Sequence, residues 1–310
     1  MNVATSIDKQ SSFSFKKIFV SFIKECKRCR LLLMSLVPDV LLNNIMFIYR
    51  LGYIPHTQHP RSLNEKLCNK KLFDRDPIQI ISADRMQVRD YVTQKVSDLR
   101  FARLLWHGTV LDYHTWEQLP QEFVLKANHG SGLIYFVDKN VDTREVIQDR
   151  MDKLLQVDYA GYAREWFYDH VESAIIIEEK LDTGNGIPPD YKFWCCNGRV
   201  QFVHIDLDRF GTHTRNLYDR DFNQLDVLLK FSKGEVIDKP AQYNRAVDIA
   251  ETIASDFDFI RVDLYLLDDG IYFGELTNTP SAGHSLFKPR SFDFEVGSKL
   301  QLNDYRRDLK

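Results

Sequence analysis

Two acidic residues near the end of the chain have the type and spacing to hold a divalent cation. Asp263 and Glu275 stand on either side of the turn sequence Asp268-Asp269-Gly270, in a segment whose first half alternates apolar and polar residues. That alternation predicts a β-hairpin, and a three-residue loop with a left-handed glycine would place the two carboxylates opposite each other. Carboxylates that close repel unless a cation lies between them, and Mg²⁺ prefers oxygen ligands. A two-residue loop would instead put them on opposite faces, and a solvated acidic pair is the alternative interpretation.

Two cationic residues could contact phosphate groups. Arg261 precedes Asp263 by two residues and therefore shares its face of the strand, where a guanidinium suits phosphate oxygens. In FVLKANHGSGLIYF, Lys126 ends a predicted strand and is followed by a loop that contains Gly130, Ser131 and Gly132. Glycines let backbone N–H groups approach phosphate oxygens closely. The segment is not a P-loop, because the lysine precedes the glycines and no helix follows; a plain glycine-turn hairpin is the alternative.

A third segment could bind the base and sugar of a nucleotide. Residues 175–181 form a buried strand that ends in Glu178 and Glu179. Such a strand end can act as a hinge that offers backbone groups to an adenine and a carboxylate to a ribose, although an ordinary strand end would have the same composition. Lys192 follows in the next predicted strand and could reach the same pocket.

The elements that must position these residues mix helices with antiparallel hairpins. Ser62 and Glu65 form a capping-box pattern that predicts a helix start, and Asn197-Gly198 between two strands is a strong hairpin signal. The first 58 residues are expected to be helical. Further helices are expected over residues 83–95, 143–156 and 241–255. This mixture predicts an α+β protein and argues against a doubly wound parallel sheet.

The composition excludes some classes of function and leaves others open. A net charge of −3 with a pI near 6.3 gives no reason to expect a nucleic-acid partner. Five cysteines, an odd number, argue against a secreted disulfide framework, and Cys26 and Cys29 are read as unpaired thiols, with metal or redox use as the alternative.

The apolar run 31–37 is too short to span a bilayer and no signal peptide is convincing, so a cytoplasmic protein is expected. Residues 16–50 mix basic and apolar residues, and they could either pack on the main domain, which we favour, or contact the inner face of the membrane.

Taken in order, these segments resemble the TupA-like ATP-grasp family, which is associated with teichuronic acid and other bacterial surface polysaccharides. The resemblance covers about residues 60 to 300, while the first 58 residues match only loosely. It implies an ATP-grasp fold in which two α+β lobes clasp ATP. The expected organisation is an N-terminal helical extension over 1–58 and a catalytic region over 59–310, with a lid-like lobe at about 104–182 and a C-terminal lobe at about 183–300. The motifs that carry it are RSLNEKL, LFDRDP, ADRMQVRDYV, FVLKANHGSG, REWFY, DYKFWCCNGRVQFV, DRF, RNLYD, FIRVDLY and IYFGELTNTP.

The resemblance also implies roles for individual residues. Asp263, Glu275 and Thr277 would hold Mg²⁺, while Arg261 and Lys126 would act on the transferred phosphoryl group. ATP contacts would come from the lid, the hinge and neighbouring strands, at Lys126, Asn128, Gly130, Ser131, Gly132, Glu178, Glu179, Lys180, Leu181, Lys192 and Arg85. The sequence departs from the usual pattern at three of its positions: Arg85 replaces a lysine, Thr277 an asparagine, and Ser281 the glycine after the proline.

The expected activity is that of an ADP-forming carboxylate–amine ligase that depends on Mg²⁺ and ATP and acts on a polysaccharide precursor. Such an enzyme activates a carboxylate as an acyl phosphate, which an amine or amino acid then attacks. Arg209, Arg215 and His284 are candidate substrate contacts, and no general base is assigned. Three alternatives remain open: a kinase that phosphorylates a sugar or lipid-linked hydroxyl, a glycosyltransferase that uses a nucleotide-sugar, and a non-catalytic scaffold.

Overall fold

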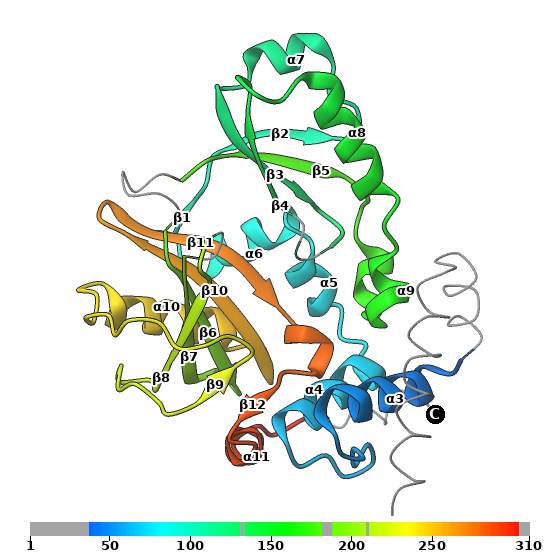
Figure 1. The fold of residues 1–310 in the computed structure, drawn as a ribbon, viewed down its shortest axis with the longest axis vertical. Helices are drawn as coiled ribbons and strands as arrows, with labels where there is room; N and C mark the ends of the chain where they lie inside the picture. The colour runs from blue at the N-terminus through cyan, green and yellow to red at the C-terminus, as the bar shows by residue number, and fades with distance from the viewer. Residues whose placement is uncertain (1–36, 131, 133, 182–187, 209–210, 304–310) are drawn as a thin grey trace, which may run out of the picture.

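The computed structural model describes residues 37–130, 132, 134–181, 188–208 and 211–303, and it consists of a small β-sheet lobe set against a larger one (Figure 1). The small sheet lies at the top of the view with α7 and α8, and the larger sheet lies below it. Helices α3 and α4 lie at the foot of the molecule beside the larger sheet. The mixture of hairpins and helices agrees with the predicted α+β class.

The larger sheet has six strands and is antiparallel apart from one edge pair, β1 with β11. Its strands, in spatial order, are β1 (Arg100–Phe101), β11 (Gly270–Thr277), β10 (Phe259–Leu267), β6 (Asp190–Cys196), β7 (Arg199–Leu207) and β8 (Thr214–Tyr218). The predicted turn between β6 and β7 is confirmed: Asn197 and Gly198 both have positive φ, at 47° and 74°, as a two-residue hairpin requires.

The two faces of this sheet differ in chemistry, and the difference positions the site. One face is apolar along its length, with Phe193, Ile260 and Val262 packed against α6 (Gln87–Lys95) and α10 (Tyr243–Ala254). The other face is apolar only at one end, where Trp194 and Phe259 pack against α4 (Leu63–Phe73) and α11 (Ser291–Lys299). Because side chains alternate along a strand, the remainder of this second face carries the charged residues of β6 and β10.

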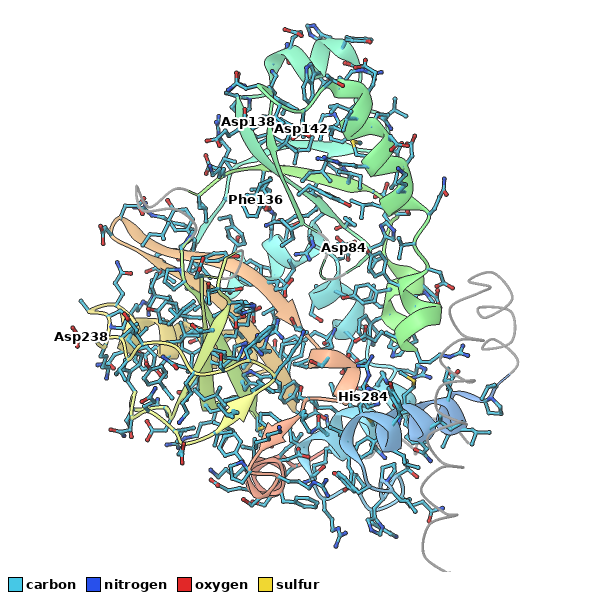
Figure 2. All side chains as sticks on the ribbon, in the orientation of Figure 1. Asp84, Phe136, Asp138, Asp142, Asp238 and His284 are labelled. Atoms are coloured by element: carbon cyan, nitrogen blue, oxygen red, sulfur yellow. The ribbon has the colours of Figure 1, made fainter. Side chains whose placement is uncertain are left out.

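The small sheet covers that charged region from the other lobe. Its order is β2 (Leu104–Gly108), β5 (Ile175–Glu179), β3 (Glu122–Ala127) and β4 (Ile134–Asp138), all antiparallel. One face packs on α7 (Tyr113–Gln118) and α8 (Arg144–Leu155) through residues such as Phe123, Ile147 and Ile177. Figure 2 shows Phe136 on the opposite side, toward the larger sheet, and Asp138 farther away.

The remaining elements connect the lobes or extend them. They are α3 (Asp39–Leu51), α5 (Ile78–Ala83), α9 (Tyr159–Ala163), the 3₁₀ helices η1 (Trp166–His170) and η2 (Pro280–Gly283), and the strand pair β9 (Leu228–Leu229) with β12 (Phe287–Lys288). Helix α3 packs on α4 through Phe47, Leu51 and Cys68. The predicted helices that fall within residues 1–36, like Cys26 and Cys29, lie outside the described residues.

The helix starts agree with the sequence patterns except in one region. The capping box is confirmed, with Ser62 accepting from the N–H of Glu65 and the Glu65 carboxylate accepting from the N–H of Ser62. The helix predicted over 83–95 is present, but it begins at Gln87 and not at Ala83, where the separate helix α5 ends. The carboxylate of Asp84 accepts the N–H groups of Met86 and Gln87 and so replaces the intrahelical bonds there.

Candidate functional site

Asp263 and Glu275 are cross-strand partners on the charged face of the larger sheet, as the sequence predicted. The three-residue loop that was predicted to place them there is wrong. Leu267 pairs with Gly270, so the loop has two residues, and Gly274 is an extra residue on β11 between the partners of Asp263 and Leu264. This β-bulge shifts the register by one residue and returns both carboxylates to the same face.

Arg261 holds the side chains of all three predicted metal ligands. Its Nε and Nη2 donate to the two carboxylate oxygens of Asp263 at 2.6 and 2.7 Å. The same Nη2 donates to Glu275 Oε1 at 3.0 Å and to Thr277 Oγ1 at 2.9 Å. Asp263 is only 1% exposed. Burial raises its pKa, and Arg261 and Lys192 oppose that shift by favouring the charged form.

The side chains of Asp263, Glu275 and Thr277 suit a hard divalent cation that also takes oxygen ligands from a second molecule. Two carboxylates and a hydroxyl supply oxygen ligands of the kind that Mg²⁺ takes. Among the residues that the structure describes, no group of three or more His, Cys, Asp or Glu could hold a metal alone. A Mg²⁺ ion at Asp263, Glu275 and Thr277 would therefore complete its coordination with water or phosphate oxygens.

Lys192 lies beside the acidic pair on the neighbouring strand. Its Nζ is 2.5 Å from Asp263 Oδ2 and 2.5 Å from Asp190 Oδ2. Asp190 was not predicted, although it precedes Lys192 by two residues and therefore shares its face of β6. The cation of Lys192 thus lies between two buried carboxylates, next to the predicted metal ligands.

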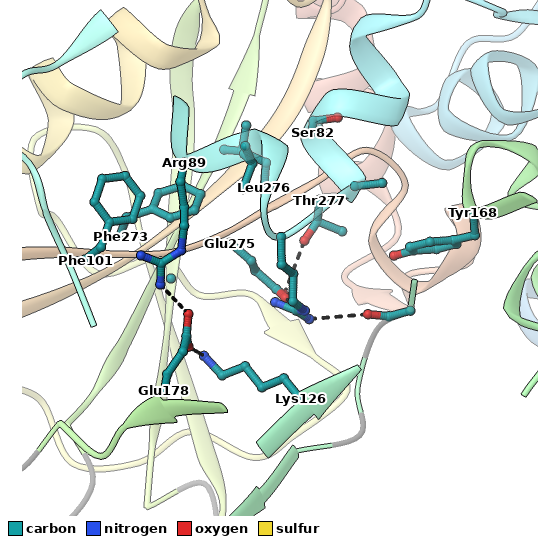
Figure 3. A pocket seen from close by; sticks show the side chains of 15 residues that line it. Ser82, Arg89, Phe101, Lys126, Tyr168, Glu178, Phe273, Glu275, Leu276 and Thr277 are labelled. Atoms are coloured by element: carbon teal, nitrogen blue, oxygen red, sulfur yellow. Dashed lines mark hydrogen bonds and ion pairs between the residues drawn. The ribbon is translucent and has the colours of Figure 1, made fainter. Parts of the chain in front are cut away.

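Lys126 approaches the same region from the small sheet, through Glu178 (Figure 3). The Glu178 carboxylate accepts from Lys126 Nζ at 2.6 Å and from Arg89 Nη2 at 2.5 Å. Burial would raise the pKa of Glu178, but the two cations outweigh burial and lower it. Arg89 was not predicted, because it comes from α6 and meets the hinge strand only in the folded protein.

Arg85 links the glycine loop of the small lobe to the acidic pair. Its Nη2 is 3.2 Å from Glu275 Oε2 and 3.3 Å from the carbonyl oxygen of Gly130, while its backbone N–H donates to Asn128 Oδ1 at 2.9 Å. An arginine at this position therefore reaches the site. Gly132 lines the same cavity as the acidic pair, and Ser131 lies outside the described residues.

An apolar slot opens between the two sheets next to the predicted hinge. Val124, Ile134 and Phe136 of the small sheet line it opposite Tyr265 and Phe273 of the larger one. The hinge residues Glu179 and Leu181 complete its wall. Lys180 instead donates through Nζ to Glu122 at 2.8 Å. The slot has the lining expected for a planar, largely apolar ring.

The second face of the larger sheet also carries a polar cluster from β7 and β8. Arg215 forms a two-pronged ion pair with Asp206, at 2.6 and 3.0 Å, and His213 Nε2 lies 3.0 Å from the same carboxylate. Burial would raise the pKa of Asp206, but contacts with His204 and Arg215 lower it. These residues line a cavity of about 550 Å³ that also contains Lys126, Lys192, Arg261, Asp263 and Glu275. Arg215 thus lies in the site region, while Arg209 lies outside the described residues.

His284 and Ser281 belong to the η2 segment, which follows the metal-ligand strand. Ser281 has φ 54° and ψ 29°, a left-handed conformation that explains why a glycine is usual here. His284 is buried where η2 meets the N-terminal helices (Figure 2). Burial and the charge of Lys71 lower its pKa to about 3, so His284 is neutral.

Two opposed α+β lobes with a cleft of carboxylates and cations between them have the arrangement of an ATP-grasp protein. Residues 65–301 match the family described as TupA-like ATPgrasp, and the chain belongs to that family. This agrees with the resemblance drawn from the sequence motifs.

The chain is similar to several solved structures at low sequence identity. D-alanine–D-alanine ligase from Bacillus anthracis is 17% identical with a TM-score of 0.42, covering 71% of this chain and 64% of that one. An L-amino acid ligase from Bacillus licheniformis is 14% identical with a TM-score of 0.40, over 65% of this chain and 41% of that one. The synthetase purK, in its ADP complex, is 12% identical with a TM-score of 0.40, covering 64% of this chain and 45% of that one. The chain therefore spans less than two thirds of the length of each of these structures.

No curated protein matches this sequence. Within the described part of the chain, no helix is both long enough and apolar enough to cross a membrane.

Proposed function

We propose that this protein is an ADP-forming ligase that uses Mg²⁺ and ATP to join a carboxylate to an amine, in the synthesis of a bacterial surface polysaccharide. The observation that carries the proposal is the convergence of Asp263 and Glu275 with Arg261, Lys192 and Lys126 around one cavity between the lobes. A buried acid and a partly buried one, surrounded by groups that suit phosphate oxygens, meet the requirement of phosphoryl transfer.

The apolar slot beside the hinge would receive the adenine. This placement would direct the triphosphate toward the acidic pair. Mg²⁺ held by Asp263, Glu275 and Thr277 would neutralise charge on the phosphates. Arg261 and Lys192 could exchange their carboxylate partners for phosphate oxygens, since both geometries are favourable for these side chains.

The reaction that follows transfers the γ-phosphoryl group of ATP to a carboxylate oxygen of the acid and releases ADP. The amine nitrogen then attacks the acyl carbon of the acyl phosphate, inorganic phosphate leaves, and the nitrogen loses a proton. The polysaccharide setting rests on the family association, and the protein would act in the cytoplasm, where its ATP is available. The polysaccharide precursor would supply one of the two substrates.

The first test of the proposal is the free energy of unfolding with Mg²⁺ and a non-hydrolysable ATP analogue. A ligand at a hundred times its Kd stabilises a fold by about 2.7 kcal/mol. We expect that gain in the wild type and its loss in Asp263→Asn/Glu275→Gln. The control Asp268→Asn/Asp269→Asn removes two carboxylates from the exposed turn of the same hairpin and should keep the gain.

The products then separate the remaining reactions. ADP formation that requires both an acid and an amine supports the ligase, whereas AMP and pyrophosphate contradict it. ADP with a phosphorylated hydroxyl and no amine would identify a kinase. Stabilisation by UDP-sugars in place of ATP would identify a glycosyltransferase, and no nucleotide response of either kind would indicate a scaffold.

A further inference from the structure

A second cavity, of about 420 Å³, meets the proposed site at Arg261 and Thr277. Its walls come from α3, α4, α9, η1 and η2, so most of it lies outside the two sheets (Figure 1). Arg261 lines both this cavity and the one that contains the acidic pair. A molecule bound here could therefore present one end to the phosphoryl group while the rest of it stayed clear of the nucleotide.

Two cations in the wall of this cavity have no ion-pair partner among the described residues. Lys71 of α4 is 2% exposed, and its Nζ donates to the carbonyl oxygen of Ala282 at 2.9 Å. Burial lowers the pKa of Lys71, as expected for an ammonium group that lacks a carboxylate in contact. Arg50, in the last turn of α3, is exposed and lines the same cavity.

The acidic groups near the cavity do not offset these two cations. Asp39 is 3.3 Å from Arg164 and is therefore matched by it. Asp158 is exposed and accepts the N–H of Gly161. Burial raises the pKa of Glu165, which accepts a hydrogen bond from the hydroxyl of Thr279. None of these three carboxylates forms an ion pair with Lys71 or Arg50, so both cations face the end of the cavity formed by α3 and α4.

An amide in the same wall also lacks a partner. Asn43 of α3 is 2% exposed, and its carboxamide makes no hydrogen bond of normal geometry within the described residues, although the thiol of Cys68 lies close to it. Buried polar groups are nearly always satisfied in native proteins, and an exception calls for a ligand, water or ion. Asn43 lines the cavity together with Lys71, so a polar ligand at that end would satisfy both groups.

We propose that this cavity binds the acid substrate, with its reacting carboxylate at Arg261 and Thr277 and a second anionic group, a carboxylate or a phosphate, at Lys71. The assignment rests on the proposed function, since it names the class of acceptor that this function would use. Met46 and Leu42 of α3 add an apolar wall, which suits the carbon frame between the two anionic groups. The acceptor is thus a compound with at least two negative charges.

Alkylation of an introduced cysteine tests the charge of the cavity without knowledge of the substrate. In Met46→Cys, the rate of cysteine alkylation is measured with anionic iodoacetate and with neutral iodoacetamide, and the first rate is divided by the second. Alkylation is followed on the peptide that carries residue 46. We expect this ratio to be about three- to tenfold higher than in Ile45→Cys, on the exposed side of the same helix. Because a ratio is used, a change in thiol pKa cancels.

Lys71→Met should remove most of the difference, and Arg50→Gln, at an exposed position that leaves the core intact, should remove part of it. Equal ratios at residues 45 and 46, or a ratio that neither variant changes, would overturn the proposal. Glutarate and inorganic phosphate are then added as competitors at 50 mM. The one that slows alkylation more identifies the second anion, and no slowing by either contradicts substrate binding here.

The nucleotide response separates this inference from the proposed function. If Mg²⁺ with the ATP analogue stabilises the wild type and the ratio shows no preference, the cavity assignment alone fails. If the preference is present and the nucleotide response is absent, the proposed function fails and the cavity remains an anion site.

Discussion

Asp263 and Glu275 face each other across β10 and β11 only because Gly274 adds a residue to the second strand. A Cβ on Gly274 would lie 3.0 Å from the carbonyl oxygen of Asp263. That contact is closer than a methyl group and an oxygen normally approach, so the backbone of the bulge would have to move. The geometry of the two acids therefore depends on Gly274, which acts through its backbone alone.

Gly274→Ala should weaken the response to Mg²⁺ and the ATP analogue more than it weakens the fold. We expect a loss of about 1–3 kcal/mol in unfolding free energy from the crowded contact, together with a clear reduction in the gain from nucleotide. The matched control is Gly270→Ala, which strains the same hairpin at φ 154° but lies away from the acids. Full nucleotide response in Gly274→Ala would show that the bulge does not set the metal geometry.

Glu178 should stabilise the protein in a pH-dependent way. Replacing it with glutamine leaves Lys126 and Arg89 without their shared carboxylate, and loss of one partner from a buried ion pair costs about 3 kcal/mol. The folded-state pKa of Glu178 is lowered, so its contribution is complete above the unfolded pKa of about 4.3 and is lost as the pH falls through the folded value. Urea unfolding of wild type and Glu178→Gln from pH 7 to 3 measures this.

The difference in stability between the two proteins should be largest near neutral pH and should shrink below about pH 4. Glu122→Gln is a suitable control, because it removes a carboxylate from a more exposed pair with Lys180 and should cost less than about 1 kcal/mol. A difference that grows as the pH falls would contradict the lowered pKa.

Local patterns predicted the elements of this protein better than they predicted its contacts. The capping box at Ser62 and the turn at Asn197-Gly198 depend on neighbours in the chain, and both are confirmed. The pairing of Asp263 with Glu275 was predicted correctly for the wrong reason, since alternation fixes the face of each residue but does not reveal a compensating bulge. The helix predicted from Ala83 begins four residues later, at Gln87, because the Asp84 carboxylate that binds the first N–H groups of α6 was not recognised.

The parts of the site that were missed are those made by tertiary contact. Arg89 reaches Glu178 across 89 positions of the chain, and no local pattern links them. The cavity at Lys71 and Asn43 depends on how α3 packs, in a region where the family resemblance is weak. Residues that share a strand with a recognisable motif could be predicted, whereas their partners from other helices could not.

Ser281→Gly should stabilise the protein. Ser281 is left-handed, which costs a residue with a side chain about 1–2 kcal/mol, while glycine adds about 0.5–1 kcal/mol of unfolded-state entropy. The expected net gain is about 0.5–1 kcal/mol in denaturant unfolding. Ser298→Gly, at an exposed position within α11, should lose about 0.5 kcal/mol. A loss in both variants would argue that the Ser281 side chain, and not its backbone, matters.

Mg²⁺ alone should have little effect on stability. Arg261 engages Asp263, Glu275 and Thr277 together, and we expect it to release them when phosphate oxygens offer an alternative partner. We expect 10 mM MgCl₂ without nucleotide to change the unfolding free energy by less than about 0.4 kcal/mol, the value for a ligand at its Kd. Thermal and urea unfolding with Mg²⁺, the ATP analogue and both together measure this dependence.

Arg261→Met should reverse that behaviour. Without the guanidinium, the two carboxylates repel each other more strongly, although Lys192 and Arg85 still pair with them. Mg²⁺ alone should therefore stabilise the fold, while the gain from nucleotide declines. Arg215→Met is the matched control, since it removes an arginine paired with Asp206 on the same face of the sheet and should leave the response to Mg²⁺ alone unchanged. If the wild type gains as much from Mg²⁺ alone as from Mg²⁺ with nucleotide, Arg261 does not compete with the metal, and its role in the phosphoryl transfer would have to be assigned differently.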